Sequence, residues 1–185
     1  MSHSGPAEQH RATGAGALRV ALLTVSDSRT PATNEGGRLL RRLAEEAGFT
    51  VVDEALVPDE TEPLRGRVTA WTAQAGEAAP DAVLITGGTG LSPRDRTPEA
   101  VTPLFDRRLP GFGELFRMLS FQEIGAAAML SRAEAGAIGS VAVFLLPGSP
   151  AAVELAMRRL IAPELAHIVG QLGGAHRGKG AAHVR

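Results

Sequence analysis

The sequence predicts an α/β fold: a three-layer α/β/α sandwich around a mostly parallel sheet, with one antiparallel hairpin. Short apolar runs of strand length alternate along the chain with segments whose apolar residues recur at helical spacing. This alternation is typical of parallel sheets that carry helices on both faces. A tight turn at Gly139-Ser140, between two apolar runs, adds the antiparallel hairpin.

Length and composition predict one soluble globular domain. A chain of 185 residues with 44% hydrophobic and 21% charged residues is long enough to bury its own core. We expect a disordered leader at residues 1–16 and a flexible, mildly basic tail at residues 173–185, because both segments are rich in small and polar residues. Residues 17–172 then form a single domain with neither an internal repeat nor a central linker.

The first half of the chain predicts three strands and two helices. The strands are expected at 18–25, 49–57 and 82–86. The first helix, at 35–47, carries an apolar stripe and ends at Gly48. The second helix lies between the second and third strands, and its apolar residues are Leu64, Val68 and Trp71.

The second half predicts four helices and the two hairpin strands. Thr97-Pro98 reads as an N-cap and a first-turn proline, opening a helix that contains Val101, Leu104 and Phe105. A further apolar stripe predicts a helix at 111–124, whose stripe belongs either to the core or to a subunit interface. The remaining elements are hairpin strands at 133–138 and 141–146, a helix opened by Ser149-Pro150, and a short last helix from Pro163 to Leu172.

The residue inventory excludes several kinds of chemistry. The chain has no cysteine and no tyrosine, and its only lysine is Lys179, in the tail. Of its five histidines, only His167 lies in the predicted folded body, where a surface position is expected. A Schiff-base lysine, a P-loop lysine and a cysteine- or histidine-rich metal site are therefore not expected. Acids, hydroxyls, arginines and backbone amides remain, and this set suits phosphate and Mg²⁺ chemistry.

The net charge and the hydropathy of the chain limit the partners and the cellular location that we expect. The formal net charge is −1, which gives no bulk attraction to nucleic acid or to an anionic membrane. No apolar run reaches the roughly 20 residues of a membrane span, and the N-terminus lacks the apolar region of a signal peptide. We expect a cytoplasmic protein without a nucleic-acid or membrane partner.

A glycine-rich turn follows the predicted strand at 82–86. Gly87, Gly88, Thr89 and Gly90 expose backbone amides that an anion can approach without meeting a Cβ atom. The turn is neither a P-loop, since Gly-Lys-Ser/Thr is missing, nor a dinucleotide-binding fingerprint, since the third glycine is absent. A plain tight turn is the alternative interpretation.

Acidic residues follow the same predicted strand end. Asp95 stands between Arg94 and Arg96, which suggests a carboxylate on Mg²⁺ and an arginine on phosphate; a surface charge cluster is the alternative. Asp59, after the second strand, is the natural second acid. Because carboxyl ends of neighbouring parallel strands meet at one edge, Ser26 and Asp27 after the first strand are expected to join them.

Three further positions are candidates for ligand contact. Gly148 and Ser149 form a second turn between a strand and a helix start and offer a second anion site, although for this turn alone a plain connection with a capping serine is the preferred interpretation. Glu114 is a candidate for contact with a heterocycle, against an ordinary acidic residue in a first helical turn. Ser131 precedes the hairpin, as a ligand contact or as a cap.

These segments together resemble the MoaB/Mog family of molybdenum-cofactor biosynthesis proteins, the molybdopterin adenylyltransferase-like group. The resemblance spans roughly residues 18–170, and its motifs occur in the family's order. The matching motifs are Thr24-Val-Ser-Asp-Ser-Arg29, Asn34-Glu-Gly, Val57-Pro-Asp-Glu60, Thr86-Gly-Gly-Thr-Gly90, Arg94-Asp-Arg-Thr-Pro-Glu99, Leu109-Pro-Gly-Phe-Gly-Glu114, Leu130-Ser-Arg132 and Leu146-Pro-Gly-Ser-Pro150. The absence of a long insertion after Leu146 suits the MoaB side of the family.

The resemblance implies an activity, a cofactor and an assembly. It implies that ATP adenylylates the phosphate of molybdopterin, with Mg²⁺, and that pyrophosphate is released. Asp59 and Asp95 match the family's essential acids, and Mg²⁺ is assigned to them. The implied substrate and nucleotide contacts are Ser26, Asp27, Gly87, Gly88, Thr89, Gly90, Arg94, Thr97, Glu114, Ser131, Gly148 and Ser149. The implied assembly is a homotrimer or a hexamer.

Two other functions remain open at the level of the sequence. One is a protein that binds molybdopterin or a precursor without adenylylating it, since some MoaB-type members are of uncertain activity. The other is a fold relative that acts at metal insertion; such proteins are longer and have several domains, which disfavours this interpretation for 185 residues.

Overall fold

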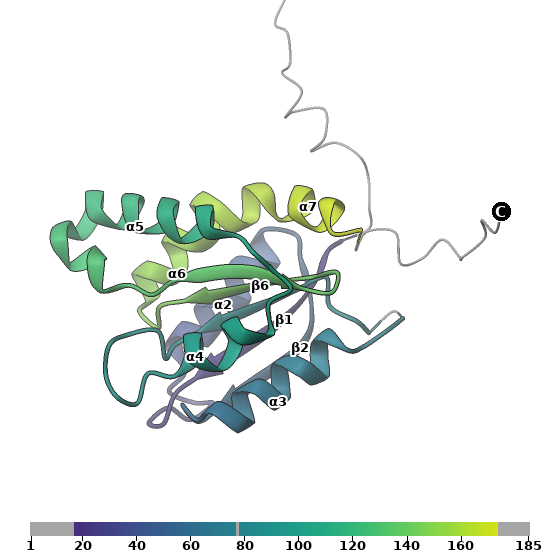
Figure 1. Cartoon of the computed structure of the whole chain (residues 1–185), viewed down its shortest axis with the longest axis horizontal. Coiled ribbons are helices and arrows are strands. Elements are labelled where there is room, and N and C mark those ends of the chain that lie inside the picture. The colour runs from purple at the N-terminus through teal and green to yellow at the C-terminus, as the bar shows by residue number, and fades with distance from the viewer. Residues whose placement is uncertain (1–16, 77, 174–185) are drawn as a thin grey trace, which may run out of the picture.

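The computed structural model describes residues 17–76 and 78–173, which form one six-stranded sheet flanked by helices (Figure 1). The leader predicted at 1–16 and all but the first residue of the predicted tail lie outside the described residues. The strands are β1 (Arg19–Val25), β2 (Thr50–Val57), β3 (Ala82–Thr86), β4 (Arg107–Arg108), β5 (Glu134–Ile138) and β6 (Val141–Leu146).

The sheet has the strand order β2-β1-β3-β6-β5-β4. Neighbours among β2, β1, β3 and β6 pair in parallel, whereas β5 pairs antiparallel with both β6 and β4. The fold class predicted from the sequence is thereby confirmed, including the hairpin, whose turn holds Gly139 at φ 59°.

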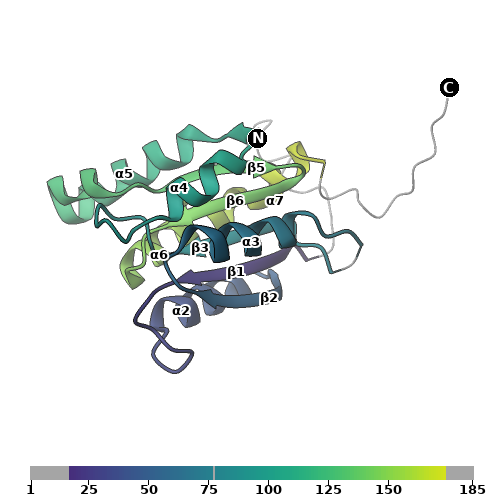
Figure 2. The ribbon, with the colours of Figure 1, turned by 60° about the horizontal axis from the view of Figure 1, so that its bottom comes forward.

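Helices cover both faces of the sheet (Figure 2). The helices are α2 (Glu35–Glu46), α3 (Thr61–Thr72), α4 (Thr97–Val101), α5 (Pro110–Ile124), α6 (Pro150–Ala156) and α7 (Ala162–Gln171). Side chains alternate along each strand, so Leu22 belongs to the core on the side of α2, α5, α6 and α7, while Leu23 belongs to the core on the side of α3 and α4. No helix among the described residues is long and apolar enough to cross a bilayer.

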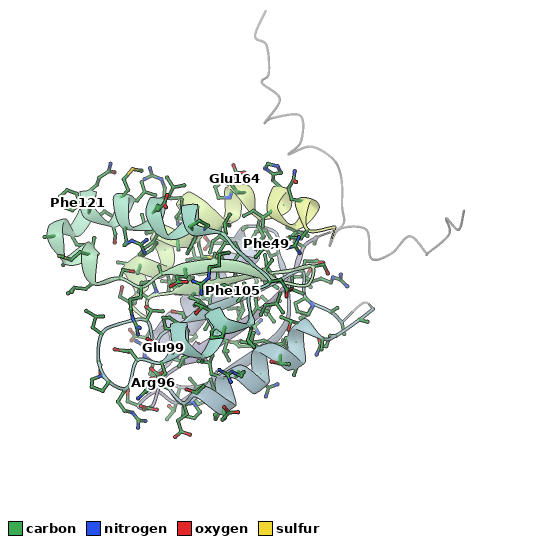
Figure 3. The ribbon with its side chains drawn as sticks, in the orientation of Figure 1. Phe49, Arg96, Glu99, Phe105, Phe121 and Glu164 are labelled. Carbon is green, nitrogen blue, oxygen red and sulfur yellow. The ribbon has the colours of Figure 1, made fainter. Side chains whose placement is uncertain are left out.

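The helix predicted to begin at Thr97 differs from expectation in two ways. Thr97 is the first helical residue rather than the N-cap, which is Arg96. The Thr97 hydroxyl instead donates a hydrogen bond to the Gly87 carbonyl oxygen, 2.9 Å away. The α-helix also ends at Val101 and continues only as a 3₁₀ turn to Leu104, so Phe105 is extended backbone (Figure 3).

Two features of the second half carried no signal in the sequence. Strand β4 has only two residues, both exposed arginines, and is too short for a periodic pattern. Helices α6 and α7 are joined by the π-helical segment Met157–Ile161 rather than by a break. Pro163, in the first turn of α7, has no N–H to continue the regular ladder, which fits a wider turn just before it.

Trp71 anchors α3 on its face of the sheet. Its side chain is 1% exposed, and its indole N–H donates to the Asp53 carboxylate on β2 at 2.8 Å. The Arg67 guanidinium lies over its ring, 5.5 Å from the centroid. The buried indole therefore has a polar partner, as a desolvated N–H requires.

Asn34 fixes the start of α2 beneath the β1 strand. Its side-chain oxygen accepts from the Gly37 N–H at 3.0 Å, and its amide nitrogen donates to Thr24 Oγ1 at 2.9 Å. The residue is buried, so both bonds form away from water.

We predict that Asn34→Ala lowers the free energy of unfolding by about 1–2 kcal/mol, because it removes a helix cap inside the protein. Denaturant unfolding measures this loss. Asn34→Ser keeps a capping oxygen and should lose less; equal losses in the two variants would contradict a capping role.

Candidate functional site

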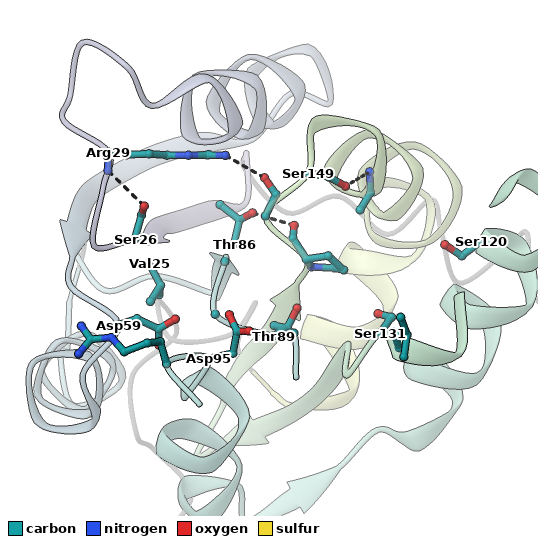
Figure 4. A pocket seen from close by; sticks show the side chains of 18 of the residues that line it. Val25, Ser26, Arg29, Asp59, Thr86, Thr89, Asp95, Ser120, Ser131 and Ser149 are labelled. Carbon is teal, nitrogen blue, oxygen red and sulfur yellow. Dashed lines mark hydrogen bonds between the residues drawn. The ribbon is translucent and has the colours of Figure 1, made fainter. Parts of the chain in front are cut away.

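A cavity of about 590 Å³ opens at the carboxyl ends of β1, β3 and β6 (Figure 4). The chain leaves β1 for β2 on one side and reaches β3 on the other, so the cavity lies at a switch point of the topology. Among its lining residues are twelve that the sequence predicted: Ser26, Asp27, Asp59, Gly87, Gly88, Thr89, Gly90, Arg94, Asp95, Ser131, Gly148 and Ser149.

Two predicted residues do not line the cavity. Glu114 is exposed on α5 and lies outside the lining, so the structure does not bring it to a heterocycle site. Thr97 is fully buried beneath the glycine turn, where its N–H donates to the Gly88 carbonyl at 3.0 Å. Thr97 therefore shapes the turn from below and does not face a ligand.

The glycine turn needs glycine at two positions for different reasons. Gly87 has φ 106°, and a Cβ atom there would collide with the Val25 carbonyl oxygen. Gly88 has φ 63°, and a Cβ atom there would lie 2.7 Å from Asp59 Oδ2. The absence of both side chains lets a carboxylate lie directly against the turn.

Asp59 lies at the floor of the cavity and is only 8% exposed. Its Oδ1 accepts from the Arg96 N–H at 2.9 Å. Burial raises the pKa of the Asp59 carboxyl above its ordinary value of 3.8; the Arg96 N–H opposes this shift, and the nearby Asp95 and Asp27 charges reinforce it. Asp59 thus occupies a site where a cation would be favourable.

Asp95 closes the loop that carries it. Its Oδ2 accepts from the Ser92 N–H at 2.8 Å and would lie 2.7 Å from a Cβ atom on residue 90, which is glycine. The second carboxylate oxygen, Oδ1, accepts no hydrogen bond from any described residue. Asp95 is partly buried and lines the cavity together with Asp59.

Asp27 and Arg94 form an ion pair across the rim. Arg94 donates through Nε and Nη2 to Asp27 Oδ2 at 2.9 and 2.6 Å, and the Asp59 N–H donates to Asp27 Oδ1 at 3.0 Å. The hydrogen bond from Arg94 holds the pKa of Asp27 below its ordinary value. Arg94, predicted as a phosphate contact, already has a carboxylate partner in this structure.

Arg132 secures the Asp95 loop, a role that sequence reasoning missed. Its guanidinium donates to the carbonyl oxygens of Gly90 and Asp95, each at 2.9 Å, and forms an ion pair with Glu99 on α4. The available signal was its place beside Ser131 in a matching motif. Because one rigid, planar guanidinium binds two carbonyl oxygens of this loop, it restricts the positions that Asp95 can take.

The opposite wall of the cavity has a different character. It comes from α5, the 3₁₀ turn Gly125–Leu130 and the start of α6. The residues there are apolar or carry hydroxyls: Phe116, Ser120, Ile124, Ala127, Ala128, Leu130, Ser131, Ser149 and Ala152. Ser149 also caps α6, since its hydroxyl accepts from the Ala152 N–H at 3.3 Å. One side of the cavity thus suits a flat organic ring, and the other suits phosphates and a cation.

Comparison with known proteins identifies the family. A domain family described as "Probable molybdopterin binding domain" matches residues 21–167. The chain belongs to this family. Molybdenum cofactor biosynthesis protein B of Bacillus subtilis (strain 168) is 48% identical over 166 residues, which cover 89% of this chain and 96% of that protein.

Solved structures of MoaB proteins share the fold. A crystal structure of Molybdenum cofactor biosynthesis protein B has a TM-score of 0.82 at 46% identity, and covers 86% of this chain and 98% of that one. The tungsten cofactor synthesizing protein MoaB from Pyrococcus furiosus has a TM-score of 0.73 at 34% identity, with 86% and 99% covered. These similarities confirm the resemblance read from the motifs, on the MoaB side.

The donor set of this MoaB-type cavity fits Mg²⁺ bound together with a phosphorylated ligand. Among the described residues, no group of three or more acidic, histidine or cysteine side chains forms a closed metal cage. Asp59 and Asp95 supply two carboxylates, and Mg²⁺ typically takes one or two carboxylates and completes its shell with water and substrate phosphates. The repulsion between these two acids is the kind that a shared cation relieves.

We predict that Asp59→Asn raises the free energy of unfolding at pH 7. The folded-state pKa of Asp59 lies above its unfolded value, so the native charge opposes folding wherever Asp59 is ionised. The gain over the wild type should shrink as pH falls through the folded pKa and vanish below about 3.8, where both states are protonated. Denaturant unfolding at a series of pH values measures it.

Glu62→Gln is the matched control, because it removes one negative charge from a highly exposed side chain on α3. This control should show no comparable gain. A wild-type stability that equals that of Asp59→Asn at every pH would refute the assignment.

Proposed function

We propose that this MoaB-type protein catalyses the ATP- and Mg²⁺-dependent adenylylation of molybdopterin. Family membership gives it a role in molybdenum cofactor biosynthesis, and the name of its relatives supports that pathway. The observation that carries the finer proposal is the pair of acids, Asp59 and Asp95, set against a side-chain-free turn in a cavity of about 590 Å³. That volume lies within the usual range of small-molecule sites.

The proposed reaction transfers AMP between two phosphates. A phosphate oxygen of molybdopterin attacks the α-phosphorus of ATP and forms a new phosphorus–oxygen bond. The bond from that phosphorus to the oxygen bridging the β-phosphorus breaks, and pyrophosphate leaves with the electron pair. The products are adenylyl-molybdopterin and pyrophosphate, and no covalent intermediate with the protein is required.

The residues of the cavity bind and orient in this proposal. The Gly87 N–H already donates to the Leu146 carbonyl at 3.0 Å, so the proposed phosphate donors are the amides of Gly88, Thr89 and Gly90; the apolar wall around Phe116 would accommodate a ring. Arg132 positions Asp95 through the loop backbone. Mg²⁺, held by Asp59 and Asp95, would neutralise charge on the transferring phosphate.

Exposed apolar side chains on α5 support the proposal that copies of this chain associate. Leu115, Met118 and Phe121 are 47%, 51% and 61% exposed, and their i, i+3 spacing puts them along one side of α5, next to its buried face; Phe121 is labelled in Figure 3. Monomers rarely expose large contiguous apolar patches. The stripe therefore divides between core and surface, and its outer half is available to a homotrimer or hexamer.

We predict that the wild type has the solution mass of a trimer or hexamer and that Met118→Glu combined with Phe121→Glu lowers it. Light scattering measures the mass. Gln122→Glu is the control, because it introduces a glutamate at an exposed position of the same helix that is already polar. A wild-type monomer would contradict the proposed assembly.

We predict that Asp95→Asn lowers the rate of pyrophosphate release about 100- to 1,000-fold while molybdopterin still binds. Loss of one electrostatic contact to a transition state typically has this cost. The asparagine can still accept from the Ser92 N–H, so the loop should keep its shape. Pyrophosphate release with ATP, Mg²⁺ and molybdopterin measures the rate, and equilibrium titration measures binding.

Asp106→Asn is the matched control, because Asp106 also accepts from a loop N–H, that of Gly139, yet lies outside the cavity. Normal turnover by Asp95→Asn would defeat its assignment. A wild type that binds molybdopterin but releases no pyrophosphate would select the binding-only function.

A further inference from the structure

Two arginines line the cavity, and their charges are compensated very differently. Arg94 donates two hydrogen bonds to Asp27 Oδ2, and its side chain is 65% exposed. Arg29 has no carboxylate partner within residues 17–76 and 78–173. A half-buried guanidinium without a counter-charge, facing a cavity, is a place where an anion gains both charge and hydrogen bonds.

The side chain of Arg29 reaches across the cavity mouth. It leaves the loop after β1, passes the end of β3 and comes within 3.5 Å of the Gly148 carbonyl oxygen, in the loop before α6 (Figure 4). At this distance the hydrogen bond is at the limit of the range and is readily exchanged. In Figure 4 the guanidinium lies across the cavity from Asp59 and Asp95.

The fold makes room for this arrangement. A Cβ atom on Gly36, in the first turn of α2, would lie 2.9 Å from Arg29 Nη1 and 3.2 Å from the Gly148 oxygen. Glycine at position 36 therefore leaves the space that the guanidinium occupies between the two loops. The backbone of Arg29 is also fixed, because its N–H donates to Ser26 Oγ at 3.2 Å.

We propose that Arg29 binds a phosphate group of the substrate and forms an anion subsite on the wall of the cavity remote from Asp59 and Asp95. The inference rests on the proposed function, in so far as both substrates are phosphorylated. The phosphate belongs either to the nucleotide or to the pterin. A guanidinium donates two parallel hydrogen bonds to a phosphate, which a backbone carbonyl such as that of Gly148 cannot match.

The test titrates Mg²⁺·ATP and molybdopterin separately against Arg29→Gln. Arg29→Gln should bind one of the two ligands about 10- to 100-fold more weakly and leave the other within about twofold, because charged hydrogen bonds contribute at this level. The ligand affected identifies the phosphate. Arg42→Gln, an exposed arginine of α2 paired with Glu46, is the matched control and should bind both ligands normally.

A second variant displaces the arginine without removing it. Gly36→Ala pushes the flexible guanidinium away and should weaken the same ligand, while helix propensity keeps α2 intact. Gly66→Ala on α3 is its control, since a Cβ atom there meets nothing within 4 Å. Arg29→Lys retains a charge and should recover part of the affinity.

The outcomes separate this inference from the proposed reaction. Unchanged affinity of Arg29→Gln for both ligands, or equal loss of both, overturns the phosphate subsite. If Arg29→Gln loses affinity for only one ligand, and the wild type releases no pyrophosphate, the subsite is supported and adenylylation is overturned. A wild type that binds neither ligand overturns both.

Discussion

The site depends on one close approach, that of the Asp59 carboxylate to the backbone of Gly88. The carboxylate occupies space that any side chain at residue 88 would fill, and the Thr97 hydroxyl supports the same turn from below. Asp59 also accepts the N–H of Arg96 at the start of α4. Two loops are thereby fixed to one another around a single buried acid: the loop after β2, and the loop that joins β3 to α4, which Asp59 contacts near both of its ends. Its desolvation is unfavourable to folding, which is common for groups held in place for chemistry.

The arginines around the cavity have different electrostatic roles. Arg94 offsets Asp27 at the rim, and Arg132 holds the Asp95 loop through backbone carbonyls and Glu99. Neither leaves an uncompensated charge in the cavity. The acids remain on one side, where a cation is favourable, and Arg29 remains on the other, where an anion is favourable. The two sides are held apart by the end of β3 and its glycine turn. Similar residues therefore perform different tasks according to whether a partner is already present.

Much of the fold was predictable, and the limits of prediction were local. Parallel strands that are buried on both faces have continuous apolar runs, so β1, β3 and β6 could be predicted from the sequence. The two residues of β4 have no period, and the role of Thr97 depends on a carbonyl ten positions away, which spacing does not reveal. For the site, strand ends gathered most predicted residues as expected. Glu114 lies outside the cavity lining because the phase of α5 turns it outward, and its contact with a heterocycle stays a prediction. The tasks of Arg94 and Arg132 depended on which acids and carbonyls the fold placed beside them.

The placement of Trp71 has a spectroscopic consequence. It is the only tryptophan in the chain, and the chain has no tyrosine. It lies near the end of α3, about 15 Å along the helix from Thr61, which follows the Asp59 loop, and its indole is buried against β2. Its emission therefore reports the integrity of the α3 layer and not the occupancy of the cavity. Trp71 fluorescence can therefore be used to follow global unfolding of the unmodified protein, independently of ligand binding in the cavity.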